Sequence, residues 1–429
     1  MMTGVIYVHS RDLRLTDNPE LQAALNMATQ AGGWFLPVAL WDPGDDELVP
    51  ELGLRRLGLH YRRYWIESVE ELQRQYEERG GRLLCARATP DELVAQLREQ
   101  FCGSDSLEIR TGRPSTLISP DMLTTLSDKV PHTFSSFRRK VEAVGLPDPQ
   151  PHDAPARIPS PPDWIERLKT HIGAGRPVDV CGADDPSPHR WDRTPEDVYE
   201  EQGGETAAHA RLQDFVWQTG ALRTYKETRN GLLGTHYSSR LSAALAHGTL
   251  SAAQVLYEVR RNETALGESE STYWLVFELL WREFFAFHLQ IYGSRFFSYD
   301  GYGPHARPLD ARGLATGKPD SEQLQAWIHG TTPDDFVNAA MRELSATGYM
   351  SNRARQNAAS YLIYDLRQPW WVGAAYFQHA LTDYDPASNW GNWAYIAGVG
   401  ADSRGGRHFN TKKQAQTYDP QGEYISAWT

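Results

Sequence analysis

Residues 272–293 read TYWLVFELLWREFFAFHLQIYG, an apolar stretch of helical length that holds only three formally charged residues. Apolar side chains surround nearly its whole circumference, which is typical of a helix inside a large bundle. Five other segments of the second half have helical patterns: 207–219, 242–248, 251–262, 336–348 and 353–366. We therefore predict that this half of the chain is a helical domain.

The first 130 residues have a different pattern. These residues contain four short runs rich in β-forming residues: GVIYVHS (4–10), GWFLPVALWD (33–42), RLLCARA (82–88) and SLEIRT (106–111). Between the second and third runs, residues 54–79 repeat apolar side chains at spacings of three and four, which predicts an amphipathic helix. Strands that alternate with helices indicate a doubly wound parallel sheet with helices on both faces, a Rossmann-like α/β domain. No GxGxxG sequence follows a predicted strand, so we do not expect a dinucleotide bound in the Rossmann manner.

The segment between the two halves is rich in proline, as in PDPQPHDAPARIPSPPDW (147–164) and ADDPSPHRWDRTP (183–195). Proline removes a backbone donor and is disfavoured in helix interiors and central strands, so these stretches predict a surface connector. The predicted organisation is an α/β domain at 1–130, a connector at 131–205 and a helical domain at 206–429.

The formal net charge of −12 is unevenly distributed along the chain. Residues 1–205 contribute −11 and residues 206–429 only −1, so the helical domain can still present a basic groove to an anion. No apolar run reaches the roughly 18 residues of a membrane span. The three cysteines form no pair with metal-ligand spacing. We expect a cytoplasmic monomer with reduced thiols, no metal and no membrane contact.

The first candidate site is the segment 225–242, YKETRNGLLGTHYSSRLS. Two glycines loosen its backbone, and three serines supply hydroxyl groups close to a predicted helix start. Unpaired N–H groups at a helix N-terminus attract phosphate, and Arg240 and Lys226 add positive charge. On its own residues, however, the segment is better explained as an ordinary N-cap with surface serines.

The second candidate site lies on the helix predicted over 273–292, which places on one side Glu278, Trp281, Arg282 and Phe285. A carboxylate among leucine and phenylalanine side chains is costly to bury unless it is paired or functional. Two interpretations remain open. Glu278 forms an ordinary i,i+4 ion pair with Arg282, or it has a raised pKa and hydrogen-bonds a base beside Trp281.

The third candidate site combines two segments. Asn352, Arg355 and Gln356 share one helical face, and residues 383–395, DYDPASNWGNWAY, form a polar and aromatic loop. Asp383 can pair with Arg355 and so complete a buried network. The alternative is ordinary turn chemistry, with the tryptophans filling a core.

Taken together, these motifs closely resemble the photolyase/cryptochrome superfamily. The resemblance covers nearly the whole chain and begins at VIYVHSRDLRLTDNPEL (5–21). Four sequences are most like the DASH cryptochromes: MSNRARQN (350–357), DYDPASNWGNW (383–393), AGVG (397–400) and KQAQTYDPQGEY (413–424).

The resemblance implies that FAD binds in the helical domain. It assigns to the pyrophosphate end of the cofactor Tyr225, Ser238, Ser239, Arg240, Leu241 and Ser242. It assigns to the ribityl chain and the ring Arg282, Asn352, Arg355, Asp383 and Asp385, with Asn389 near flavin N5. It implies a cavity for a flipped-out pyrimidine dimer, lined by Glu278, Trp281, Asn352, Gln356 and Tyr395.

The implied activity is that of a carbon–carbon lyase, in which blue light drives an electron from reduced FAD into a cyclobutane pyrimidine dimer and splits it. The implied partner is damaged DNA, preferably single-stranded or looped, which Arg229 and Arg353 would contact. Two other functions stay open: a blue-light receptor with little repair activity, and a non-catalytic flavoprotein that binds nucleic acid.

The chain departs from the family pattern in its aromatic residues. Trp393 and Trp370 match the inner and middle members of the family's electron-transfer chain, but Gly317 stands where the outer tryptophan is expected. The third member is therefore unassigned, and two alternatives stay open. Either Trp371, Trp327 or a nearby tyrosine takes its place, or photoreduction of the flavin is slow.

A second departure concerns the folate antenna (MTHF) of the family. Residues 101–105, FCGSD, replace a strand and a helix near the antenna site, and TTPDD (331–335) replaces a neighbouring motif. Two possibilities stay open: the antenna is absent, or a rearranged loop holds it through Glu108.

Overall fold

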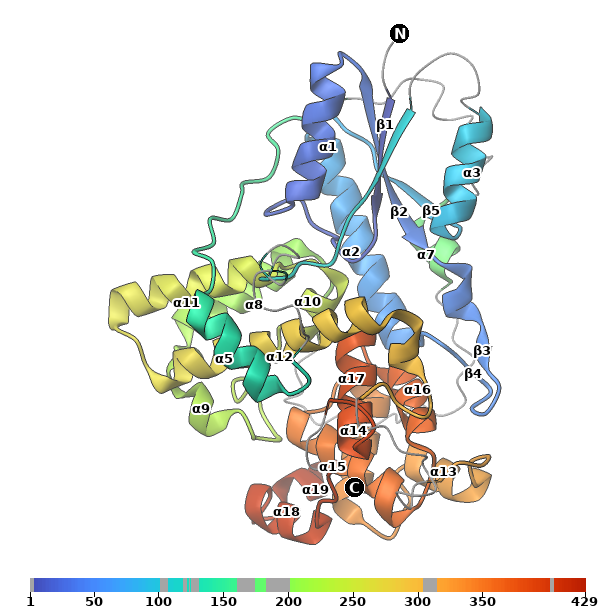
Figure 1. Ribbon diagram of the computed structural model, residues 1–429, viewed down its shortest axis with the longest axis vertical. Coiled ribbons are helices and arrows are strands. Elements are labelled where there is room, and N and C mark those ends of the chain that lie inside the picture. Colours follow the sequence, from blue (N-terminus) through green and yellow to red (C-terminus); the bar gives the residue numbers. More distant parts are fainter. Residues whose placement is uncertain are drawn as a thin grey trace.

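The computed structural model describes residues 4–100, 107–118, 122, 124, 131–159, 174–182, 201–303, 315–401 and 405–429. A parallel sheet flanked by helices forms the N-terminal part, and a helical bundle forms the C-terminal part (Figure 1). Both halves of the predicted fold class are thus confirmed.

The sheet contains the four predicted strands, β1 (Gly4–His9), β2 (Trp34–Trp41), β5 (Leu84–Arg87) and β6 (Leu107–Thr111). Their order across the sheet is β5-β2-β1-β6, and every neighbouring pair is parallel. This order places β1 and β2 in the centre, where their nearly continuous apolar sequences can be buried on both faces.

Alternate residues of β1 enter two separate hydrophobic cores, as the two-residue period of a strand requires. Val5 and Tyr7 pack in a core with α1 (Pro19–Gln30) and α2 (Leu59–Glu78). Ile6 and Val8 pack in the other core with Leu93 and Leu97 of α3 (Pro90–Gln100). Figure 1 shows α1 and α2 on one side of the sheet and α3 on the other.

The helix predicted over 54–79 begins five residues later than expected. Leu54–Arg55 instead forms a short strand, β4, that pairs antiparallel with Leu48–Val49, β3. Gly58 then caps α2 in an extended conformation, and its N–H donates to the carbonyl of His379 at 2.9 Å. The apolar period continues through residues 54–58, which explains why periodicity alone gave the wrong start.

The segment after β6 contains helices as well as the expected irregular stretches. These helices are α5 (Phe134–Val144) and α7 (Pro177–Cys181). The proline-rich stretch 183–195 and residues 160–164 lie outside the described residues, whereas 146–159 is irregular, as its prolines predict.

The bundle is built from α8 (Glu205–Gln213), α9 (Tyr225–Thr228), α10 (Ser242–His247), α11 (Ala252–Leu266), α12 (Glu270–Tyr292), α13 (Ser321–Ile328), α14 (Asp335–Thr347), α15 (Asn352–Ser360), α16 (Trp370–Ala380), α17 (Pro386–Ala397), α18 (Thr411–Tyr418) and α19 (Glu423–Ala427). The apolar stretch 272–293 forms most of α12, which packs against α5, α9, α11 and α17. Its burial on several sides agrees with its apolar circumference.

The loop after β1 joins the sheet to the bundle. The backbone N–H of Leu13 donates to the carbonyl of His247, and the Arg14 guanidinium donates to the carbonyl of Gly248 at 3.0 Å. Gly248 has a φ of +73°, and a Cβ there would lie 1.9 Å from the carbonyl oxygen of Arg11. A glycine is therefore required where α10 ends against the first domain.

Candidate functional site

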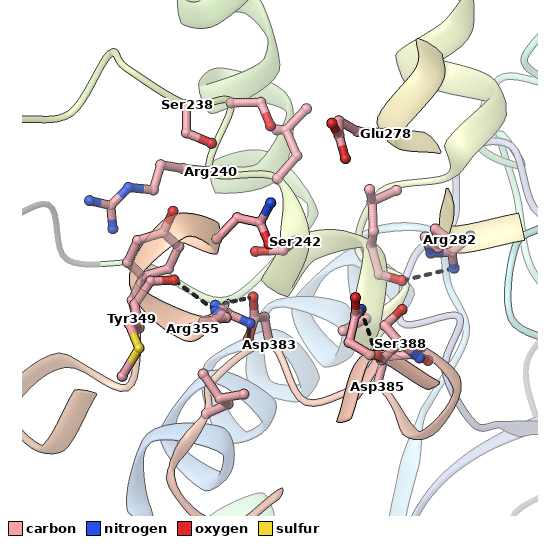
Figure 2. A pocket seen from close by; sticks show the side chains of 18 of the residues that line it. Ser238, Arg240, Ser242, Glu278, Arg282, Tyr349, Arg355, Asp383, Asp385 and Ser388 are labelled. Carbon is pink, nitrogen blue, oxygen red and sulfur yellow. Dashed lines mark hydrogen bonds and ion pairs between the residues drawn. The ribbon is translucent and has the colours of Figure 1, made fainter. Parts of the chain in front are cut away.

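A cavity of about 280 Å³ lies inside the bundle, between α9, α10, α12, α15 and α17. The predicted site residues that line it are Tyr225, Ser238, Ser239, Arg240, Leu241, Ser242, Glu278, Arg282, Asn352, Arg355, Gln356, Asp383, Asp385 and Asn389, together with Arg229 and Trp393. The structure therefore brings together residues that are up to 168 positions apart, from Tyr225 to Trp393. Figure 2 shows the cavity with Ser238 and Arg240 on one side and Glu278 on another.

The serine-rich loop at one end of the cavity is shaped by Arg211. Its guanidinium donates to the carbonyls of Ser239 and Ser238, each at 2.9 Å. Arg240 has a left-handed backbone with a φ of +55°, and its guanidinium lies over the ring of Tyr349, 3.5 Å from the centroid. Ser242 begins α10, and no side chain in the described part of the protein caps this first turn. The loop thus presents hydroxyl groups, a cation and a helix start to the cavity.

Arg355 and Asp383 form the ion pair that the sequence predicted. The guanidinium donates two hydrogen bonds to the carboxylate, at 3.0 and 2.8 Å, and a third to the carbonyl of Met350 at 2.7 Å. Burial alone would lower the pKa of Arg355, but the neighbouring Asp383 raises it above its ordinary value. This bidentate pair, drawn with dashed lines in Figure 2, fixes one wall of the cavity.

The start of α17 contributes two further groups. Asp385 is the N-cap of this helix and accepts a hydrogen bond from the N–H of Ser388 at 2.7 Å. It also pairs with Arg11 of the first domain at 3.2 Å. One turn later, the side-chain amide of Asn389 donates to the carbonyl of Ala374 at 2.9 Å, which orients that amide at the cavity wall.

Glu278 pairs with Arg229 of the segment after α9, and not with Arg282. The guanidinium of Arg282 instead donates to the carbonyl of Ser115 at 2.6 Å and lies 3.3 Å from Glu283. Of the two open interpretations, the i,i+4 pair with Arg282 is therefore wrong, because Arg229, directly after α9, supplies a cation that is distant in sequence. Burial raises the pKa of Glu278, and Arg229 opposes that effect.

Trp281 and Tyr395 are neighbours outside the residues that line the cavity itself. Their ring centroids are 5.6 Å apart, with planes at 74°. One face of the Trp281 indole is stacked on Phe134 of α5, with centroids 3.8 Å apart and planes at 8°. The hydroxyl of Tyr395 accepts a hydrogen bond from Arg407 at 2.6 Å. Both rings are therefore held by contacts that the sequence did not indicate.

The two tryptophans of the predicted electron route lie on adjacent helices. Trp393 of α17 lines the cavity, and its ring occupies the space beside Gly373, where a Cβ on α16 would meet it at 2.2 Å. Trp370, three residues earlier on α16, donates its indole N–H to the carbonyl of Tyr299 at 2.9 Å. Gly317 is exposed and has no atom within 4 Å of a Cβ position.

Two features of the sequence bear on a folate antenna: residues 101–105 and Glu108. Residues 101–105 lie outside the described residues. Glu108 is on the edge strand β6, and its carboxylate pairs with Arg110 at 3.0 Å.

Two family models match this chain. The description "DNA photolyase" applies to residues 5–104, and "FAD binding domain of DNA photolyase" applies to residues 274–429. The curated relative from Gloeobacter violaceus, a cryptochrome DASH, is 38% identical over all of this chain and 86% of its own length. A cryptochrome DASH from Natronomonas pharaonis is also 38% identical, over all of this chain and 90% of its own length.

The chain belongs to the photolyase/cryptochrome family.

Solved structures of this family agree with the fold. A cryptochrome of Synechocystis sp. PCC6803 superimposes with a TM-score of 0.84 at 32% identity, covering 99% of this chain and 88% of the other. A class III photolyase of Agrobacterium tumefaciens superimposes with a TM-score of 0.77 at 27% identity, covering all of this chain and 86% of the other.

The groups that line the cavity fit the FAD that this family's domain binds. An anionic pyrophosphate needs hydroxyl, N–H and cationic donors, which the 238–242 loop presents together. The polar edge of a flavin needs amide and charged groups, and Asn352, Asn389 and Arg355 line the same cavity.

Among the described residues, no cluster of His, Cys, Asp and Glu could hold a metal ion. None of the helices in the described ranges combines the length and apolar character of a membrane span.

Three residues of this family member take part in the site without having been predicted. They are Phe134, Tyr349 and Arg11. Tyr349 stands directly before a segment that was recognised, so proximity could have indicated it. The other two come from distant parts of the chain, and nothing in their local sequence points to the cavity.

Proposed function

We propose that this photolyase-family protein uses blue light and FAD to split cyclobutane pyrimidine dimers in single-stranded or looped DNA. The observation that carries the proposal is that a phosphate-binding type of loop and the carboxyl group of Glu278 line one cavity. One end of that cavity suits a cofactor, and the other presents a hydrogen-bonding acid beside aromatic side chains.

Each part of the chain has a role in this proposal. The 238–242 loop, Arg355, Asp383 and Asn389 would hold FAD, which when bound supplies the electron that opens the dimer ring. A dimer cannot be reached inside stacked DNA, so it must be flipped out or already unstacked. Trp281 and Tyr395 would hold its rings, and Glu278 with Gln356 would bind its polar edge.

The test is repair of an oligo(dT) that contains one dimer, as a single strand and as a duplex, under blue light. We expect repair of the single strand and weaker repair of the duplex. Glu278→Gln should lower repair per absorbed photon about tenfold, while the flavin absorbance of the purified protein stays the same. Unchanged repair per photon would remove Glu278 from the proposal.

A blue-light receptor is the alternative outcome of the same assay. Bound FAD without repair of either strand would favour that function. Absorbance of the purified protein near the folate band, beside the flavin peaks, tests separately for an antenna.

A further inference from the structure

Glu278 and Arg229 form an ion pair at the edge of the cavity. The side chain of Arg229 is 21% exposed and that of Glu278 is 29% exposed, and both line the cavity. The Arg229 guanidinium also lies over the indole of Trp274, 4.1 Å from the centroid. The pair is thus within reach of a molecule that enters the cavity, and Trp274 supports the cation from one side.

A second arginine lies close to this pair. Arg353 donates to Gln356 at 2.9 Å and to Asn230 at 2.8 Å, and it lies over the ring of Tyr418. No carboxylate is within ion-pair distance of Arg353 in the described ranges. Burial lowers the pKa of Arg353, and the charge of Arg229 acts in the same direction. Two arginines thus influence each other here, and only Arg229 is paired with a carboxylate. The uncompensated positive charge favours an anion, and a phosphate oxygen would supply it.

We propose that Arg229 is exchanged between two partners: a backbone phosphate of the bound strand takes it from Glu278, and Glu278 then takes up one proton from solvent. The proposal rests on the proposed function, and in it the binding of the DNA strand changes the protonation state of Glu278. One O–H bond forms on Glu278, one ion pair replaces another, and no electron is transferred in this step.

The surroundings of Glu278 give the physical reason. The charged or titratable groups that face it are Arg229 and Tyr225 from the α9 region, whereas Arg282 of its own helix is bonded to Ser115 and Arg353 is held by Gln356 and Asn230. Arg229 is therefore the cation that opposes the effect of burial on this carboxyl group. A partly buried carboxylate that loses its cation is destabilised, and protonation relieves that cost.

The charge state of Glu278 matters for recognition of a base. A carboxylate can only accept hydrogen bonds, but a carboxylic acid can donate one to a pyrimidine carbonyl. Coupling the proton to strand binding means that Glu278 is already a donor when a base of the bound strand enters the cavity. Without DNA, Glu278 stays paired with Arg229 and can only accept hydrogen bonds.

Calorimetry of the FAD-loaded protein in the dark tests the exchange. Binding of the dimer-containing oligo(dT) is measured near neutral pH in two buffers of different ionisation enthalpy. We expect an uptake of about one proton per bound strand. Glu278→Gln should bind the strand without proton uptake, and Arg229→Lys should retain the uptake because it keeps a cation that phosphate can capture.

Arg353→Gln is the matched control, because it removes a neighbouring arginine and leaves the ion pair intact. It should weaken binding about tenfold at low salt and still take up the proton. Arg229→Gln should bind without uptake, because its Glu278 is protonated from the start. Its DNA-free infrared spectrum should contain a carboxylic acid C=O band that the double variant with Glu278→Gln lacks.

Binding without proton uptake in the unmodified protein would overturn the exchange and leave the proposed function standing. Uptake that persists in Glu278→Gln would overturn it as well. No binding of the strand at all would overturn the proposed function, and the exchange with it.

Discussion

Gly373 shows how one residue without a side chain positions a functional ring. A Cβ at this position would lie 2.2 Å from the Trp393 ring and 2.4 Å from a methyl carbon of Leu362. Both neighbours are buried, so neither can move without disturbing the core. The glycine therefore lets α16 and α17 approach closely enough for Trp393 to reach the cavity.

Replacing Gly373 by alanine should destabilise the protein although alanine favours helix. The helical preference would contribute about 1 kcal/mol of stability, but overpacking of a dense core costs about 1–3 kcal/mol. With two close contacts we expect a net loss of about 2 kcal/mol in the urea unfolding free energy, together with weaker retention of FAD. Gly317→Ala, at an exposed position with open space, is the control and should change neither. A Gly373→Ala protein as stable as the parent would show that Trp393 can shift freely.

At the residue scale, the sequence predicted Arg355 and Asp383 correctly but not the partner of Glu278. The first pair was indicated by two motifs, one with Arg355 and one with Asp383, that were both recognised in the sequence. For Glu278, helix geometry favoured Arg282 one turn away. The preference was overridden by Arg229, whose proximity depends on how α9 packs against α12 and cannot be read from either segment alone.

At the scale of elements, α5 supports the part of α12 that carries the site. Phe134 stacks on Trp281, and the imidazole of His288 hydrogen-bonds the carbonyl of Pro131 just before the helix. On another side, Glu283 of α12 accepts hydrogen bonds from the backbone N–H groups of Leu117 and Ile118. The chain after β6 thus holds α12 at several points along its length.

Phe134→Leu should weaken binding of dimer-containing DNA while FAD binding is preserved. Leucine keeps the site apolar but loses the ring that stacks on Trp281, an interaction worth about 0.5–1.5 kcal/mol. We expect an increase in Kd of roughly 3–10-fold, measured by fluorescence anisotropy with a labelled single strand. Phe134→Tyr should restore the affinity because it restores the stack.

Phe137→Leu is the matched control for this experiment. Phe137 is one turn further along α5, is also buried, and contacts Phe284 and Phe287 instead of Trp281. It should lower stability without changing the Kd for DNA. Equal effects of the two substitutions on Kd would mean that α5 acts only through general stability.

Prediction from sequence succeeded for elements with a strong pattern of their own. The four strands and the long helix α12 were identified because their apolar patterns are long or bounded by glycine. The start of α2 was misplaced because residues 54–58 continue the helical period yet pair with Leu48–Val49. Strand pairing with the nearby Leu48–Val49 decides the conformation there, and the helical period of residues 54–58 does not reveal it.

At the scale of the whole molecule, the two domains meet at the wall of the cavity. Arg11, in the loop after β1, reaches Asp385 on the edge of the site, and the ring of His247 lies against Tyr61 and Tyr64 of α2. The sheet domain therefore takes part in shaping the site although its own strands carry none of the lining residues. Sequence could separate the domains by composition, but it gave no sign of this interface, since no local pattern marks it.

His247 makes this interface sensitive to acid. Its ring is buried and its Nε2 lies 3.0 Å from the carbonyl of Thr382, which identifies that nitrogen as the protonated donor of a neutral ring. Burial lowers its pKa from 6.5 to about 3, so between these values the unfolded chain binds a proton at this position and the folded chain does not. The stability that this neutral histidine contributes is complete above about pH 6.5 and is lost progressively as the pH falls toward 3.

His247→Gln should reduce this acid sensitivity, because glutamine can donate to the Thr382 carbonyl without binding a proton. From about pH 6 downward, the parent protein should lose up to about 1.4 kcal/mol of unfolding free energy per pH unit more than the variant. Urea unfolding of both proteins at several pH values measures the two slopes, and their difference isolates His247 from other groups, such as His288, that also titrate. His288 is unchanged in the variant and gives both proteins a shared acid-dependent loss. Parallel slopes would contradict the prediction and would place the proton-sensitive part of the molecule away from the interface between the domains.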